Sequence, residues 1–164
     1  MEISPRASQR PPRFTGLNHL SIPVRNREEA VRWFTEVLGA DLALDNPTFT
    51  EVLLAGTIIG ISEQKGGWTA PDAEFPHYAF SVEGEDMGPM KERLEAFGIP
   101  THAIWTRHGV EALMYFRDPS GNLFEMYCTK GYPGAPTAPR PSHWGGDYSI
   151  DFRALCYDTW GAKG

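Results

Sequence analysis

The feature that most constrains this fold is an internal duplication. Residues 18–42 read NHLSIPVRNREEAVRWFTEVLGADL, and residues 76–101 read PHYAFSVEGEDMGPMKERLEAFGIPT. In each copy a histidine opens a strand of alternating apolar residues, a polar turn follows, and an amphipathic helix ends in glycine. The histidine and the glycine are 20 residues apart in the first copy and 21 in the second. The chain therefore predicts two related modules in tandem.

Both helices have clear boundaries in the sequence. We expect Asn26 to cap the first helix and Gly39 to end it, and Asp86 and Gly98 to do the same for the second. Strand-like runs follow each helix, at 41–45, 49–55 and 57–62 in the first copy and at 101–106, 111–117 and 122–128 in the second. Each copy thus reads as a β-α-β-β-β module, too small to bury its own sheet well.

We therefore predict an α+β fold in which two tandem βαβββ modules form one curved mixed sheet, followed by a C-terminal extension. The predicted parts are a flexible N-terminal arm, the first module, a linker, the second module and a Pro/Gly-rich tail, at 1–13, 14–62, 63–75, 76–130 and 131–164. Within the tail, SIDFRALCYDTW has apolar residues at near-helical spacing. We expect it to form a short docking helix over the sheet, a dimer seam or the mouth of a site.

Composition excludes several classes of partner. A formal charge of -6 without any basic run argues against nucleic acid. The longest apolar run, VLLAGTIIGI, is too short to cross a bilayer, and the N-terminus lacks the apolar segment of a signal peptide. Two cysteines make neither a disulfide framework nor a zinc knuckle. We expect a cytoplasmic protein that binds neither membrane nor nucleic acid.

Strand periodicity places two histidines and one glutamate on the inner face of the predicted sheet. His19 and His77 occupy equivalent positions in the two copies and point away from the face under the helix. Glu125 is a carboxylate in the middle of an apolar strand, where an unpaired charge is costly. Two imidazoles and one carboxylate are typical of a non-heme Fe(II) site. A buried ion pair between Glu125 and one histidine is the alternative, and the repeated histidine favours the metal.

The chain resembles the vicinal oxygen chelate superfamily, which includes glyoxalase I, fosfomycin-resistance enzymes, extradiol dioxygenases and methylmalonyl-CoA epimerase. The resemblance covers residues 16 to about 130 and rests on GLNHLSIPV, FTEVLGADL, PHYAFSV and YFRDPSGNLFEMY. The last motif is the most specific, because it places a glutamate directly after a tight turn. The resemblance implies a curved sheet around a metal that His19, His77 and Glu125 bind. It also implies a homodimer, since single-domain members commonly dimerise and sometimes build each site from two chains.

Differences from the family patterns separate its members. Gly60 stands where glyoxalase I has a fourth ligand, which disfavours glyoxalase and epimerase. Ser21 stands where fosfomycin-resistance enzymes keep a threonine, but the basic groups that hold a phosphonate are poorly represented. The stretch RHGVEALMYFRDPSGNLFEMY is closest to the extradiol dioxygenases, with a tyrosine ten residues before the glutamate. By this resemblance His108 would transfer a proton and Tyr115 would orient the chelating oxygen.

We therefore expect a non-heme Fe(II) enzyme of the extradiol dioxygenase type, acting with dioxygen on a small aromatic or vicinal-oxygen organic substrate. The residues predicted to contact this substrate are Ser21, Trp68, Trp105, Arg107 and Tyr127. We expect His102 and His143 to be inert. With Mn(II), Zn(II) or Ni(II) instead, the site would suit a Lewis-acid isomerase, lyase or fosfomycin-resistance-like transferase. A non-catalytic drug-binding resistance protein is a third alternative, which the intact ligand set disfavours.

Overall fold

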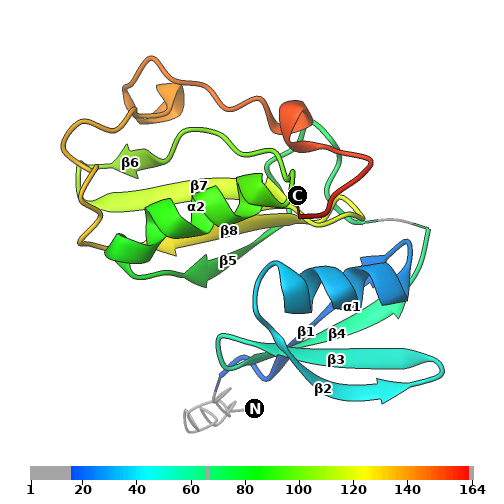
Figure 1. Cartoon of the computed structure of the whole chain (residues 1–164). Helices are drawn as coiled ribbons and strands as arrows, with labels where there is room; N and C mark the ends of the chain where they lie inside the picture. The colour runs from blue at the N-terminus through cyan, green and yellow to red at the C-terminus, as the bar shows by residue number, and fades with distance from the viewer. Residues whose placement is uncertain (1–15, 66, 163–164) are drawn as a thin grey trace, which may run out of the picture.

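The computed structural model describes residues 16–65 and 67–162, which form two βαβββ modules (Figure 1). The first module contains β1 (His19–Val24), α1 (Arg27–Glu36), β2 (Asp41–Asn46), β3 (Phe49–Leu54) and β4 (Thr57–Glu63). The second contains β5 (His77–Ser81), the 3-10 turn η1 (Gly84–Asp86), α2 (Met87–Ala96), β6 (Trp105–Arg107), β7 (Glu111–Arg117) and β8 (Leu123–Cys128). The predicted α+β class and the duplicated module are confirmed. The predicted arm at 1–13 lies outside the described residues.

The strands form two four-stranded mixed sheets with equivalent topology. Their orders are β1-β4-β3-β2 and β5-β8-β7-β6, so the first strand of each module pairs in parallel with the last. We expected one curved sheet within the chain. The described structure has two separate sheets instead. Their edge strands β1 and β5 pair with β4 and β8, respectively, and not with each other. Each sheet therefore keeps an unpaired edge beside its first strand.

The helix ends follow from local chemistry, with one exception. The Asn26 side chain accepts a hydrogen bond of 2.8 Å from the third backbone N–H of α1, and Gly39 follows that helix with a φ of +70°. Gly98 follows α2 with a φ of +74°. The predicted cap at Asp86 is wrong, because α2 is entered through η1 and the Asp86 side chain makes no capping bond. Neither helix, nor any other in the described chain, is long and apolar enough to cross a membrane.

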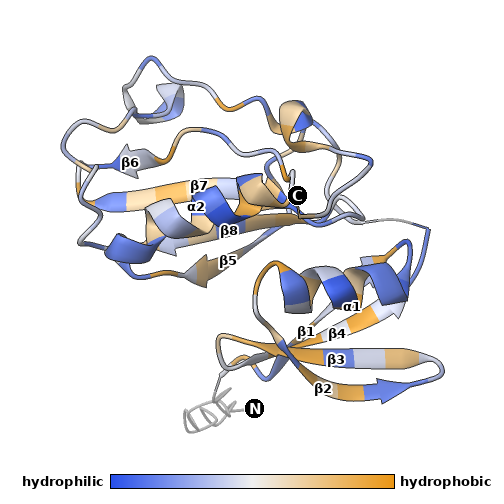
Figure 2. Cartoon of the chain, in the orientation of Figure 1, coloured by the Kyte–Doolittle hydropathy of each residue, from blue (hydrophilic) through white to orange (hydrophobic). Residues whose placement is uncertain are grey.

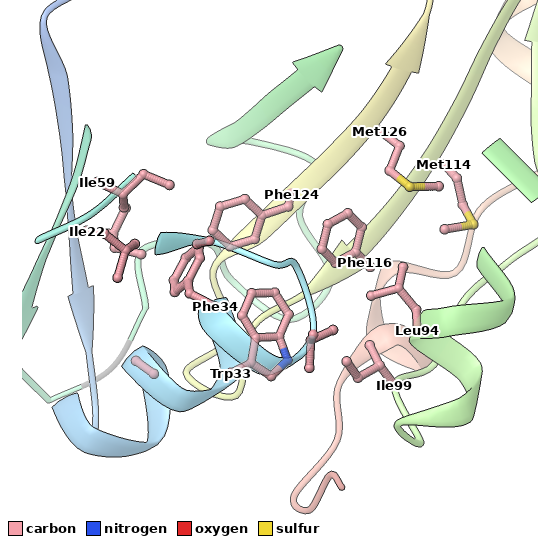
Figure 3. Close-up of a cluster of buried hydrophobic side chains, with 14 of the residues drawn as sticks. Ile22, Trp33, Phe34, Ile59, Leu94, Ile99, Met114, Phe116, Phe124 and Met126 are labelled. Atoms are coloured by element: carbon pink, nitrogen blue, oxygen red, sulfur yellow. The ribbon is translucent and has the colours of Figure 1, made fainter. Parts of the chain in front are cut away.

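One hydrophobic core joins the two modules (Figure 3). The Trp33 ring of α1 lies 6.2 Å from the ring of Phe116 and 6.1 Å from that of Phe124, both in the second sheet. Phe34 contacts Phe124 edge-on at 5.8 Å. Figure 2 shows how strongly apolar residues concentrate on β7 and β8. Burial of these large aromatic side chains therefore holds together two modules that could not each bury a sheet.

Hydrogen bonds between the modules accompany this core. The Arg93 side chain of α2 donates to the carbonyls of Glu36 and Val37 at the end of α1, both at 2.6 Å. The Asn122 amide donates to the carbonyl of Pro23 in β1 at 2.8 Å. The face of each sheet that no helix covers, called the helix-free face below, points away from this shared core. His19 and Ser21 lie on this face of the first sheet.

The tail after β8 is turn-rich, as expected, and contains two 3-10 turns, η2 (Ser142–Trp144) and η3 (Phe152–Leu155). The short docking helix expected within residues 149–160 is limited to the four residues of η3, which form a 3-10 helix. Leu155 packs on the helix-free face of the second sheet, whereas Trp160 donates a 3.1 Å hydrogen bond to Glu29 on α1. One straight helix could not bring both residues to surfaces on opposite sides of a sheet, so the chain forms a short turn and continues extended.

Candidate metal centre

His77 and Glu125 meet on the helix-free face of the second sheet. His77 opens β5, and Glu125 lies on the neighbouring strand β8, with 4% of its surface exposed. The His77 Nε2 and the Glu125 Oε2 atoms are 3.4 Å apart. Two atoms bound to one ion at right angles, each at about 2.0–2.2 Å, would lie about 3 Å apart. The pair thus has the chemistry and spacing of two adjacent ligands of one cation.

His19 does not join this pair within the same chain. It is exposed at the start of β1, where its Nδ1 lies 2.9 Å from the Asn18 side-chain oxygen. Over the described ranges, no group of three or more His, Cys, Asp or Glu side chains is placed to hold a metal ion. One chain therefore brings together two of the three predicted ligands. Among the described residues of one chain, Glu125 pairs with His77 alone, which is the ion pair that the sequence left open as the alternative to a metal site.

Tyr115 stands beside this pair. It faces Glu125 across the β7–β8 ladder, and its ring meets the His77 ring edge-on at 5.3 Å. Its hydroxyl donates to the Glu74 carboxylate at 3.1 Å. Burial, together with the carboxylates of Glu125 and Glu74, raises the pKa of Tyr115 far above its usual value. The phenol therefore stays protonated and remains a hydrogen-bond donor.

Glu74, in the linker between the modules, is a site residue that sequence reasoning missed. Its backbone carbonyl lies 2.9 Å from the His77 Nδ1. Since a carbonyl only accepts, this contact places a proton on Nδ1 and leaves Nε2 facing Glu125. The hydrogen bond to Glu125 is the main reason that the pKa of His77 lies above its usual value. In the sequence, the only sign of this role is that Glu74 lies three residues before His77, and that spacing alone is too weak to identify it.

The linker itself is held by a buried arginine. Arg117, at the end of β7, is 1% exposed and donates to the linker carbonyls of Ala70 and Pro71, both at 3.1 Å. It also donates to the carbonyl of Gly121 at 2.6 Å. Its charge is thus used to order backbone groups, which cost free energy when buried without a partner. Arg117 positions the segment that leads to Glu74.

Three of the predicted substrate contacts lie farther along the same face. Arg107, in β6, donates to the Glu111 carboxylate and to the Tyr127 hydroxyl. Trp105 is buried in an apolar cluster that also includes Tyr115. These residues share a surface with the metal-ligand pair, but Arg107 already has two partners within the protein.

The tail covers much of this surface. Phe152 meets Tyr115 edge-on at 5.3 Å, and Leu155 is 2% exposed in the same apolar cluster. The Tyr157 hydroxyl then donates to the Arg117 carbonyl at 2.8 Å. The tail therefore places the Phe152 ring and the Leu155 side chain beside Tyr115.

His102 is not the inert strand residue that we expected. It precedes β6, and its Nε2 accepts a 2.8 Å hydrogen bond from the Tyr115 backbone N–H. Its Nδ1 lies 2.7 Å from the Ala103 carbonyl, and its ring lies 6.2 Å from that of Tyr148 in the tail. Burial lowers the pKa of His102 to about 4. The neutral imidazole thus links β7 to the loop before β6 and to the tail.

His108 lies away from the His77–Glu125 pair. It occupies the turn between β6 and β7 with a φ of +58°. Four residues of strand, from Glu111 to Tyr115, separate that turn from the ligand pair, which corresponds to about 13 Å. Within one chain, His108 is therefore too far along β7 to share this site.

Ser21 and Trp68 line a different cavity of about 540 Å³ beside β1 and β4. Gly60, which the resemblance aligns with the fourth ligand of glyoxalase I, lies opposite Ser21 in the β1–β4 ladder. A Cβ atom at Gly60 would lie 3.0 Å from the Phe49 ring and 3.1 Å from the Ser21 hydroxyl. A larger residue at this position would therefore require Phe49 to move.

Residues 16–126 match the glyoxalase/bleomycin resistance protein/dioxygenase superfamily, and the chain belongs to this superfamily. The chain is 31% identical to the glutathione transferase FosA of Serratia marcescens over 114 residues, which are 68% of this chain and 79% of the relative. It is 25% identical to the fosfomycin resistance protein FosX of Listeria innocua, covering 70% of this chain and 90% of that protein. The structure of FosX from Listeria monocytogenes with Mn(II) and sulfate has the same fold, with a TM-score of 0.61, 23% identity and coverage of 76% and 96%.

These relatives correct the expected reaction class. The protein was expected to be an extradiol dioxygenase, and that prediction is wrong. The relatives are glutathione and metallothiol transferases and fosfomycin resistance proteins, together with a glyoxylase I of Arabidopsis thaliana that is 28% identical over 138 residues. Iron and dioxygen lose their support with that class. The misleading signal was the Arg-His, Tyr and Pro-Ser-Gly spacing, whose histidine lies in a distant turn.

Proposed function

We propose that the protein is a Lewis-acid enzyme with a divalent metal, Mn(II) before Zn(II) or Ni(II), bound by His77, Glu125 and His19. The pair of half-buried His77 and buried Glu125 carries this proposal, because its donor atoms suit such an ion and its strands are those that bear ligands in the resemblance. The bound metal would polarise a substrate with two neighbouring oxygens. The proposed reaction is addition of a thiol or of water to a strained carbon–oxygen bond such as that of an epoxide, the alternative that the transferase relatives support. The new C–S or C–O bond forms as the ring C–O bond breaks, and the released oxygen takes up the proton of the nucleophile.

His19 would come from a second copy of the chain. β1 and β5 are edge strands that carry the two equivalent histidines, and an unpaired edge is a template for another chain. The helix-free face beside His19 also exposes apolar side chains, including Leu44 at 45% and Leu53 at 39%. A homodimer in which the His19 of one protomer joins the His77–Glu125 pair of the other would cover this face and complete the site.

The surrounding residues support substrate binding in two ways. Tyr115 offers a protonated phenol beside His77, which suits stabilisation of negative charge on a bound oxygen. Phe152 and Leu155 would limit access of water from the tail side. Arg107 and Arg117 both bond to groups of the protein itself. A doubly charged phosphonate would have to compete with these partners, so the proposal is the wider class of vicinal-oxygen compounds. Fosfomycin is the first substrate to test, because the relatives include fosfomycin resistance proteins.

The test follows fosfomycin consumption by phosphorus NMR, with Mn(II) and with glutathione, cysteine or water alone as the nucleophile. We expect turnover that needs Mn(II) and is lost in Glu125→Ala. Glu85→Ala is the matched control, because it removes an exposed carboxylate from η1. If calorimetry shows no Mn(II) binding by the wild type, the metal function is refuted. If Mn(II) binds and fosfomycin survives, only this substrate is refuted.

Mixing two inactive variants tests whether the site is shared between copies. In a mixed dimer of His19→Ala and Glu125→Ala, one of the two sites regains all three ligands. Random exchange of protomers makes half of the dimers mixed, so about one quarter of wild-type sites should return. If mixing restores no Mn(II) binding although the protomers exchange, the two-copy site is wrong.

A further inference from the structure

Glu74 holds the proposed ligand His77 from two sides. Its backbone carbonyl accepts from the His77 Nδ1 at 2.9 Å. Its carboxylate accepts from the Tyr115 hydroxyl at 3.1 Å, and the Tyr115 ring stands edge-on to His77, with the planes at 73°. One linker residue thus contacts the imidazole directly and also through the tyrosine that packs against it.

The linker around Glu74 is clamped on both sides. Before it, Arg117 donates to the carbonyls of Ala70 and Pro71. After it, the hydroxyl of the buried Thr69 donates to the carbonyl of Pro76. These bonds restrict the backbone at both ends of a segment that has no regular secondary structure. The ends of this segment are therefore restrained, and the bond between the Glu74 carboxylate and Tyr115 is a further attachment between them, at Glu74 itself.

We propose that Glu74 is a positioning residue for the metal centre, with its carbonyl orienting His77 and its carboxylate anchoring that carbonyl through Tyr115. This role rests on the proposed metal function. A histidine ligand that donates its second ring N–H to a carbonyl is fixed in both tautomer and ring orientation, and loss of such an outer partner lowers metal affinity about 10- to 100-fold. The carboxylate does not bind the metal in this proposal.

The hydrogen bond between Tyr115 and the Glu74 carboxylate predicts how substitutions at the two residues should change metal affinity. Glu74→Ala and Tyr115→Phe each remove the same hydrogen bond, so their effects on metal affinity should be similar and should not add. Glu74→Gln keeps an oxygen that can accept from Tyr115 but loses the negative charge. Comparison of these two Glu74 variants therefore separates hydrogen bonding from simple charge attraction between the carboxylate and the metal.

The experiment measures the Mn(II) dissociation constant by calorimetry for the wild type, the three single variants and the Glu74→Ala/Tyr115→Phe double variant. We expect Glu74→Ala and Tyr115→Phe to bind about 10- to 100-fold more weakly. The double variant should be no weaker than the weaker single variant, and Glu74→Gln should return close to wild type. Glu85→Ala, which removes an exposed carboxylate elsewhere, should match the wild type.

Nitrogen NMR of the His77 imidazole supplies a second readout, in metal-free protein at an alkaline pH at which the ring is neutral. We expect the Nδ1–H tautomer in the wild type and a mixture of tautomers in Glu74→Ala. Unchanged affinity and tautomer in Glu74→Ala, additive effects of the two substitutions, or a Glu74→Gln variant as weak as Glu74→Ala would each overturn the positioning role. Absence of Mn(II) binding by the wild type would refute the metal centre and this role together.

Discussion

Replacing Arg117 with methionine should unfold the linker before it affects either sheet. The side chain is buried, and three of its hydrogen bonds, to the carbonyls of Ala70, Pro71 and Gly121, are 3.1 Å or shorter. A hydrogen bond to a charged group contributes about 1.5–3 kcal/mol, and the desolvation of the guanidinium offsets part of the sum. Methionine has no donor, so the carbonyls lose their partner. We expect a net loss of about 3–5 kcal/mol in the free energy of unfolding.

Urea unfolding followed by circular dichroism measures this loss. In thermal unfolding of a chain of this size, the same loss should lower the melting temperature by roughly 10 °C. Arg153→Met is the matched control, because Arg153 pairs with Asp72 at 3.2 Å while both side chains are 66% exposed. An exposed pair of this kind contributes about 0–1 kcal/mol.

A different result would refute the reasoning. If Arg117→Met lost less than about 1 kcal/mol, with an unchanged dependence on urea, the linker carbonyls would have to find water or other donors at little cost. The buried arginine would then fill space without ordering the backbone. Hydrogen exchange that becomes faster in Arg117→Met only at residues 67–76 would support the reasoning, because it would show that the linker opens while both sheets stay folded.

Three further predictions concern the tail, pH and packing. Leu155→Ala should cost about 2–4 kcal/mol, because the side chain is buried against the second sheet; limited proteolysis should then cut the tail first. His102 has a lowered pKa, so its contribution to stability is present above about pH 6.5 and is lost as the pH falls toward 4, by up to about 3 kcal/mol. Urea midpoints at pH 7 and pH 4.5 should show this component in the wild type and not in His102→Gln. Gly84→Ala should destabilise by about 1–3 kcal/mol, because the new Cβ would lie 2.1 Å from the Gly131 backbone, while Gly88→Ala, with open space, should be neutral or stabilising in thermal unfolding.

Elements defined by short-range signals could be predicted from the sequence. Asn26 and Gly39 mark the ends of α1 because capping depends on residues within one helical turn. Strand alternation placed Glu125 on the inner face of its sheet, and the ladder between β7 and β8 puts Tyr115 directly opposite it. The duplicated pattern then predicted the two modules, because each half repeats the same local signals.

Groups joined across long stretches of chain could not be found in this way. Arg117 reads as an ordinary strand residue, yet its acceptors at Ala70 and Pro71 are more than forty residues away. Glu74 lacks any pattern that links it to Tyr115, 41 residues later. In the tail, near-helical spacing could not show that Leu155 and Trp160 reach different surfaces, so the helix is shorter than the spacing suggests. Tertiary contacts decided each of these cases.

The same distinction explains why the fold was predictable and the reaction class was not. The YFRDPSGNLFEMY motif specifies a strand, a turn and a strand with Glu125 facing inward, and this local geometry suits many members of one superfamily. The chemistry depends instead on what surrounds the ligand pair. In this chain those surroundings come from the linker at Glu74, from the tail at Phe152 and, in our proposal, from the His19 of a second copy. None of these lies within the motif, so a resemblance in that motif cannot identify the reaction.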